Sequence, residues 1–113
     1  MAKLHNDLTA MDAADFCKAN GTVMRIISTM FRRGWFKVRA LLQTLAAYNM
    51  SIEDVLDAID YFEDRGYIQV RDADTRTEMR SCDAQEIDEI EMRLTADGKL
   101  LGYKLMADDG IDL

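Results

Sequence analysis

The feature of this 113-residue chain that most constrains its fold is a change of hydrophobic period at Gly66. Before the glycine, apolar residues recur at the spacing of one face of an α-helix, and they are Ile52, Val55, Leu56, Ile59 and Phe62. After it, Ile68 and Val70 alternate with polar residues, which is the period of a β-strand with one buried face. The pattern predicts a helix that follows the N-cap Ser51, ends at Gly66 and runs directly into a strand over 67–71.

Capping residues and the same two periods place the other elements. Thr9 with Asp12 fits the capping box that opens a helix, and Thr95 fits an N-cap. The pair Asn20-Gly21 fits a helix stop. In chain order, the expected elements are a helix over about 10–19, a helix over 22–33, a very short strand over 35–37, a helix over 38–48, the helix and strand on either side of Gly66, a polar loop over 72–88, a strand over 90–94 and a helix over 96–106.

The predicted fold class is α+β and mostly α. The strands over 67–71 and 90–94 each have one apolar face, so we expect them to form a hairpin with a long loop. There is no proline, internal repeat or low-complexity linker in the chain, which argues against a boundary between two large domains. We divide the chain into an N-terminal arm with a short helix over 1–21, a domain over 22–105 and a frayed acidic tail over 106–113.

Three segments share the layout of a known superfamily. "VRALLQTLAAYNMSIEDVLDAIDYFEDRGYI" contains two helices and a glycine exit, "IQVRDADTRTEMRSCDAQEIDEIEMRL" is the hairpin, and "MRLTADGKLL" leads from strand to helix. Together they resemble the winged helix-turn-helix superfamily, in particular small MarR-like and PadR-like proteins of bacterial or phage type, over about residues 22–105. The resemblance implies a two- to three-stranded wing sheet, flanking N- and C-terminal helices, and a DNA-binding transcription regulator that is commonly a dimer.

Charge is distributed unevenly along the chain. The net charge of −7 argues against nucleic-acid binding driven by the field of the whole molecule. Residues 22–50 hold five bases and no acid, whereas residues 51–113 hold 18 acids and 7 bases, a local charge of −11. The sequence therefore offers two candidate binding surfaces of opposite sign.

The acidic candidate surface is the outward face of the third helix of the resemblance, which in a winged helix enters the major groove. This face presents Glu53, Asp57, Asp60 and Asp64, with no base before Arg65. Phosphate repels unpaired carboxylates, so we do not expect this helix to read bases. The open alternatives are a solvated acidic face and a surface for a basic protein partner, including a surface that mimics DNA.

The basic candidate surface comprises a corner after the helix over 22–33 and the predicted wing. Its candidate nucleic-acid-binding residues are Arg25, Arg32, Arg33, Lys37 and Arg39 at the corner and Arg71, Arg76 and Arg80 in the wing. These side chains could contact the DNA backbone and a neighbouring groove. The alternative is that they are solvated or pair with the acids of the third helix within one monomer.

The sequence contains no catalytic constellation. His5 is the only histidine and has no ligand partner at useful spacing, and Cys17 and Cys82 stand alone, without a C-x-x-C or metal-ligand spacing. "DADTRTEM" begins like a calcium loop but lacks its turn glycine and closing glutamate. We therefore expect a non-enzymatic protein with no cofactor and no metal.

The remaining expectations concern location and partners. No apolar run approaches the roughly 20 residues that cross a bilayer, and the N-terminus lacks the apolar core of a signal peptide. With the isolated cysteines, this predicts a cytoplasmic protein with no membrane partner.

We expect a homodimer formed by the flanking helices, whose apolar residues Phe16, Leu100, Leu101 and Leu105 need burial. The predicted function is a DNA-associated regulator that uses the basic corner and wing, and the alternative is a protein-interaction module that uses the acidic helix.

Overall fold

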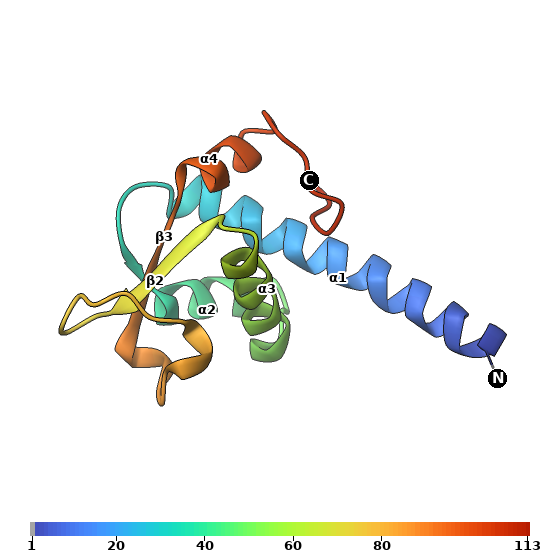
Figure 1. The fold of residues 1–113 in the computed structure, drawn as a ribbon, viewed down its shortest axis with the longest axis horizontal. Helices are drawn as coiled ribbons and strands as arrows, with labels where there is room; N and C mark the ends of the chain where they lie inside the picture. Colours follow the sequence, from blue (N-terminus) through green and yellow to red (C-terminus); the bar gives the residue numbers. More distant parts are fainter. Residues whose placement is uncertain (1) are drawn as a thin grey trace.

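The elements of the computed structural model follow the predicted order except at the two ends of the chain. The structure describes the backbone of residues 2–113 and the side chains of residues 12–113. The elements are α1 (Ala2–Met30), β1 (Phe36–Lys37), α2 (Val38–Ala46), α3 (Ile52–Asp64), β2 (Ile68–Asp72), β3 (Ile90–Leu94) and α4 (Ala96–Gly102), with single 3-10 turns at Ser81–Asp83 and Ile87–Glu89 (Figure 1). The fold is α+β and mostly helical, with one small antiparallel sheet.

The sheet has the strand order β1-β3-β2, and both pairings are antiparallel. In the hairpin, Ile68 lies opposite Leu94 and Val70 lies opposite Met92. On the other side of β3, Phe36 of β1 also pairs with Met92. The predicted hairpin, its apolar face and the very short first strand are confirmed.

The helices cover one face of this sheet and close the core. Val23 and Ile27 of α1, Ile59 and Phe62 of α3 and Met92 of β3 have no exposed surface. The predicted caps at Ser51 and Thr95 and the predicted stop at Gly66 are confirmed, because the Asp54 amide donates to Ser51 Oγ, the Gly98 amide donates to Thr95 Oγ1, and Gly66 has a left-handed φ of 77°. Ile52 is an exception to the predicted buried face of α3: it is 61% exposed, since it is the first residue of the helix and lies beyond the end of the core.

The predicted helix stop at Asn20-Gly21 is wrong, because both residues lie inside the single helix α1. A Cβ on Gly21 would lie 1.9 Å from the backbone oxygen of Asp112, so the glycine admits the C-terminal chain rather than ending the helix. The Asp112 amide donates to the Cys17 carbonyl at 3.0 Å, and Asn20 Nδ2 donates to the Gly110 carbonyl at 2.9 Å. α1 therefore begins at Ala2 rather than near residue 10, and the proposed cap side chain of Thr9 lies outside the described side chains.

The expected fraying of the acidic tail is also wrong. α4 ends at Gly102, earlier than predicted, and Lys104 turns the chain with a left-handed φ of 62°. The following segment packs back across α1 (Figure 1). Within it, Ile111 is 6% exposed and Asp108 is 9% exposed. The tail is held because its apolar and charged side chains both find partners on the body of the protein.

Gly21→Ala tests this packing. In the full chain we expect the substitution to lower the free energy of unfolding by about 1–3 kcal/mol, because the added methyl group overpacks the contact with Asp112. In a chain that ends at Gly110, the same substitution should raise the free energy of unfolding by up to about 1 kcal/mol, the helix preference of alanine over glycine. Urea denaturation of the four proteins measures both effects. Stabilisation of the full chain would contradict the observed docking of the tail.

Candidate functional site

The acidic face of α3 is divided into two parts by the hairpin loop. Near its C-terminal end, Arg80 of the loop lies 2.6 Å from Asp64 and 3.7 Å from Asp60. The same guanidinium lies 3.2 Å from Glu63, whose side chain is 5% exposed and also accepts hydrogen bonds from Ser81. One base of the same chain therefore contacts all three acids of this half of the face and partly compensates their charge.

The N-terminal part of the same face has no such compensation. Glu53, Asp54 and Asp57 are exposed. No ion pair joins any of them to a base among the side chains described by the structure. Of the four acids predicted as a protein-binding surface, the structure thus leaves Glu53 and Asp57 open and places Asp60 and Asp64 beside Arg80.

Three of the eight predicted nucleic-acid-binding residues are already paired with acids. Arg80 binds the acids of α3, as the alternative interpretation of the sequence proposed. Arg39 forms a two-bond ion pair with Asp88 of the loop, and this hydrogen bonding raises the pKa of Arg39 and lowers the pKa of Asp88. Arg71 pairs with Glu91 on the neighbouring strand.

Arg71 also has an aromatic contact. Its guanidinium carbon lies 3.9 Å from the ring centroid of Trp35, and the guanidinium carbon of Arg93 lies 5.0 Å from the same centroid. This is the geometry of a cation–π interaction. The wing arginine is thus held between a carboxylate and an indole ring.

The other five predicted bases are exposed. Arg25 approaches Thr22 Oγ1 at 3.5 Å, and Arg76 lies in the hairpin turn with a left-handed φ of 61°. Arg32, Arg33 and Lys37 flank the turn at Gly34, and we call these three residues the basic corner. Within the described side chains, none of the five forms an ion pair with an acid.

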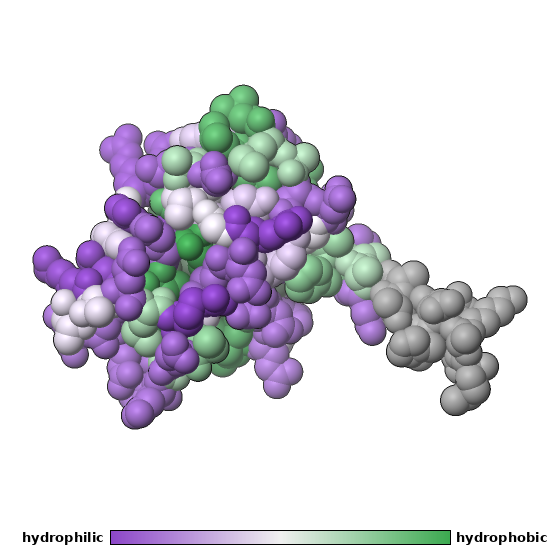
Figure 2. All heavy atoms as spheres, viewed as in Figure 1, coloured by the Kyte–Doolittle hydropathy of each residue, from purple (hydrophilic) through white to green (hydrophobic). Residues whose placement is uncertain are grey.

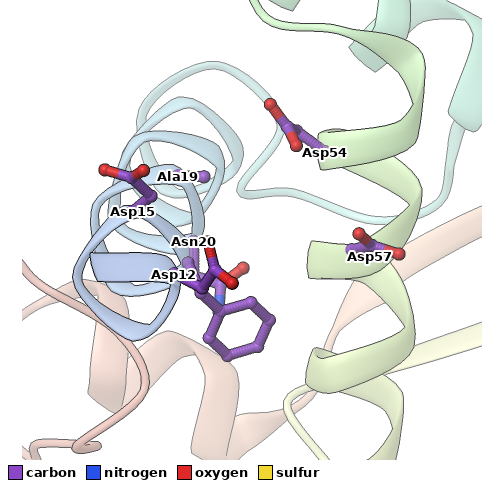
Figure 3. A pocket seen from close by; sticks show the side chains of 7 residues that line it. Asp12, Asp15, Ala19, Asn20, Asp54 and Asp57 are labelled. Atoms are coloured by element: carbon purple, nitrogen blue, oxygen red, sulfur yellow. The ribbon is translucent and has the colours of Figure 1, made fainter. Parts of the chain in front are cut away.

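A groove of about 490 Å³ lies between α1 and α3 beside the open part of the acidic face (Figure 3). Its α1 wall carries Asp12, Phe16 and Asn20, which follow one another at four-residue spacing and so share one helix face. Its α3 wall carries Asp54 and Asp57, which are three residues apart. The lining is completed by Asp15 and Ala19, and Figure 3 shows the Asp15 carboxylate directed away from α3. We call this feature the acidic groove; the described residues contribute four aspartates and no base to its lining.

The acidic groove also contains a buried acceptor without a partner. Asn20 is 1% exposed, and its Nδ2 is used by the bond to Gly110. Its Oδ1 has no hydrogen-bond partner among the described residues. A buried polar atom without a partner costs about 1–3 kcal/mol, so Asn20 is a second feature of the groove, distinct from its carboxylates.

Phe16 is positioned by a cluster that the tail completes. Its ring meets the ring of Tyr61 edge to face, with centroids 5.2 Å apart and planes at 86°. Tyr61 and Tyr67 both donate their hydroxyl protons to the Asp108 carboxylate, which also lies 3.0 Å from Arg65 Nε and 2.8 Å from the Gly110 amide. The tail thereby fixes the aromatic side of the acidic groove.

Asp108 is the charged hydrogen-bond acceptor at the centre of this cluster. Burial acts to raise the pKa of Asp108, but hydrogen bonds from Tyr61, Tyr67 and Gly110, together with the charge of Arg65, outweigh it and lower the pKa. Burial, reinforced by the bond to Asp108, raises the pKa of Tyr67 to about 12. The carboxylate is therefore ionised and the tyrosine is protonated at neutral pH.

The sequence interpretation missed the α1 side of the groove and the role of Asp108. The sequence pattern places Asp12 in a capping box at a helix start, and Asp54 is not among the four acids of the predicted acidic surface. The signal that was available is the four-residue spacing of Asp12, Phe16 and Asn20. It was hidden because Asn20-Gly21 was interpreted as a break between two helices.

Apolar residues gather at another part of the surface. Figure 2 shows them over α4 and the segment that follows it, whereas hydrophilic residues cover most of the rest of that face. Leu100, Tyr103 and Leu105 are 42%, 60% and 73% exposed, while Leu101 is buried in the core. The homodimer stays a prediction. Its interface would cover the exposed side chains of Leu100 and Leu105.

Other classes of site find no support in the described part of the chain. Within it, no group of three or more His, Cys, Asp or Glu side chains is arranged to hold a metal ion. No described helix is both long enough and apolar enough to cross a membrane. No protein-family model matches the chain, and comparisons with curated proteins and with solved structures found no match.

Asp108→Asn tests the cluster through its pH dependence. At pH 7 we expect the free energy of unfolding to fall by about 1.5–3 kcal/mol, the range for hydrogen bonds to a charged group. The pKa of Asp108 is lower in the folded protein than its value of about 3.9 in an unfolded chain. Its contribution is therefore complete above that value and is lost as the pH falls through the folded pKa. Urea denaturation from pH 7 to pH 2 should show the difference between the wild type and the variant shrinking in acid, and a constant difference would contradict the assignment.

Proposed function

We propose that this chain is a winged-helix protein that binds a basic segment of a protein partner through the acidic groove and the open part of α3. The helix pair α2–α3, the strand order β1-β3-β2 and the long-looped hairpin support the winged-helix assignment. The proposed role is binding without catalysis. It corresponds to the alternative function predicted from the sequence.

One observation carries this proposal. Near α3, the available bases are already used by acids of the same chain, as in the pairs of Arg80 with Asp64 and Arg39 with Asp88. Asp12, Asp54 and Asp57 form no ion pair with a described base, and they line one groove to which no described base contributes. A surface of this kind attracts cations and repels phosphate.

Base reading by α3 does not fit this charge arrangement. Major-groove recognition relies on arginine, lysine, asparagine or glutamine side chains that reach base edges. The face of α3 that would enter the major groove offers Glu53 and Asp57 instead, and its other two acids, Asp60 and Asp64, share the single base Arg80.

A second candidate function is the DNA-associated regulator predicted from the sequence. The observation that favours it is the basic corner, whose Arg32, Arg33 and Lys37 are exposed and form no ion pair with the described acids. Because Arg39 is engaged with Asp88, the corner itself would offer about three side chains to phosphate. Counterion release then gives a log–log salt slope near −2.7 for duplex binding.

Matched variants distinguish the two functions. The first carries Glu53→Gln, Asp54→Asn and Asp57→Asn, and the second carries Arg32→Ala, Arg33→Ala and Lys37→Ala. A control with the same charge change as the first carries Asp74→Asn, Asp83→Asn and Glu86→Gln, all on the exposed loop. The probes are a labelled peptide that repeats the unit Gly-Arg-Ala-Lys three times and a labelled duplex of about 20 base pairs, both followed by fluorescence anisotropy.

We expect the acid variant to bind the peptide about tenfold more weakly than the wild type, because it loses three pairings of modest strength. The loop control and the base variant should bind it as the wild type does. Equal loss in the loop control would show that only net charge matters and would contradict a specific surface. Duplex binding with the predicted salt slope, abolished in the base variant, together with no peptide binding, would favour the regulator instead.

A further inference from the structure

We infer that the acidic groove selects arginine: the guanidinium of a partner arginine packs against Phe16 while the surrounding carboxylates accept its N–H groups. The inference rests on the proposed function. It adds the side-chain chemistry that the groove recognises within a basic segment.

The spread of the carboxylates favours a planar, extended cation over a point charge. Asp12 lies on the α1 wall, and Asp54 and Asp57 lie on the α3 wall (Figure 3). Among the described residues these acids do not form a cluster that would hold a metal ion, so they do not converge on one point. A guanidinium carries five N–H donors in one plane and can serve acceptors on two walls, whereas an ammonium presents its three donors around a single atom.

The aromatic ring of Phe16 in the groove also favours arginine over lysine. Phe16 is 37% exposed, and its edge-to-face contact with Tyr61 holds the ring in place. Guanidinium groups are more weakly hydrated than ammonium groups and stack on aromatic faces. An arginine entering between the carboxylates would therefore find an ordered aromatic surface beside them.

Two arginines of the chain already contact both a carboxylate and an aromatic ring. Arg71 pairs with Glu91 and lies 3.9 Å from the ring centroid of Trp35. Arg65 lies 3.0 Å from Asp108 and 5.6 Å from the ring centroid of Tyr61. In both cases one guanidinium is shared between a carboxylate and an aromatic ring. The acidic groove offers the same two components and lacks only the arginine.

Asn20 provides a separate indication of a donor ligand. Its Oδ1 is buried without a hydrogen-bond partner among the described residues, in a side chain that lines the groove. This oxygen is an acceptor, so the group that satisfies it must bring an N–H or O–H donor. It is an uncharged amide oxygen rather than a carboxylate oxygen, so it points to a donor ligand independently of the acidic residues.

The test compares two peptides that differ only in the cation. One repeats the unit Gly-Arg-Ala four times and the other repeats Gly-Lys-Ala four times, both labelled with fluorescein and titrated with the full chain at low salt. We expect the arginine peptide to bind about fivefold more tightly, in keeping with one cation–π contact. Phe16→Tyr should keep this preference. Phe16→Leu, which retains an apolar side chain against Tyr61, should reduce it to less than about twofold while both peptides still bind.

The outcomes separate this inference from the proposed function. Equal binding of both peptides to the wild type would overturn arginine selection and leave binding of basic segments standing. An arginine preference that survives Phe16→Leu, or that is unaffected by Asp54→Asn with Asp57→Asn, would show that the guanidinium binds elsewhere and would also overturn it. No binding of either peptide would overturn both proposals. Thermal unfolding of each variant checks that a lost preference is not a lost fold.

Discussion

The contact of the C-terminal tail with α1 at Gly21 is the constraint on which the rest of the arrangement depends. Because the glycine has no side chain, the backbone of Asp112 reaches the helix, and Asn20 holds the carbonyl of Gly110. The tail in turn delivers Asp108 to the hydroxyl groups of two tyrosines. One of these, Tyr61, orients Phe16. A small residue in the middle of a helix thus helps to place the tail that orients the aromatic side of the acidic groove.

The carboxylates of α3 serve two different purposes. Near the C-terminal end of the helix they bind the hairpin loop, where Arg80 and Ser81 satisfy a nearly buried Glu63. Near its N-terminal end they remain open beside Asp12 of α1. Among the described residues both halves keep a net negative charge, which opposes contact with a polyanion. The acids therefore have an internal role in holding the loop and, in the proposed account, an external role in binding a cation.

Much of the fold was predictable because its signals are local. The cap at Ser51, the left-handed Gly66 and the change to a two-residue period lie within one short segment and specify the α3–β2 junction without help from the rest of the chain. The continuous α1 was not predictable, because the reason for Gly21 lies in Asp112, far away in sequence. For the same reason, the sequence shows which bases and acids are present, but it does not predict that Arg39 pairs with Asp88. The acidic groove combines both cases, since Asp57 of its α3 wall was expected whereas its α1 wall depends on the distant tail.

The central claim is that the acidic groove, and not the basic corner, is the binding surface. Two-dimensional ¹H–¹⁵N NMR of the labelled full chain, titrated with the peptide that repeats Gly-Arg-Ala-Lys, tests it most directly because it locates the contact without a mutation. The account predicts that amide signals shift progressively in residues 12–20 and 52–58, while those of 32–37 stay in place. Shifts confined to the apolar surface around α4, or no shifts at all at low salt, would contradict it.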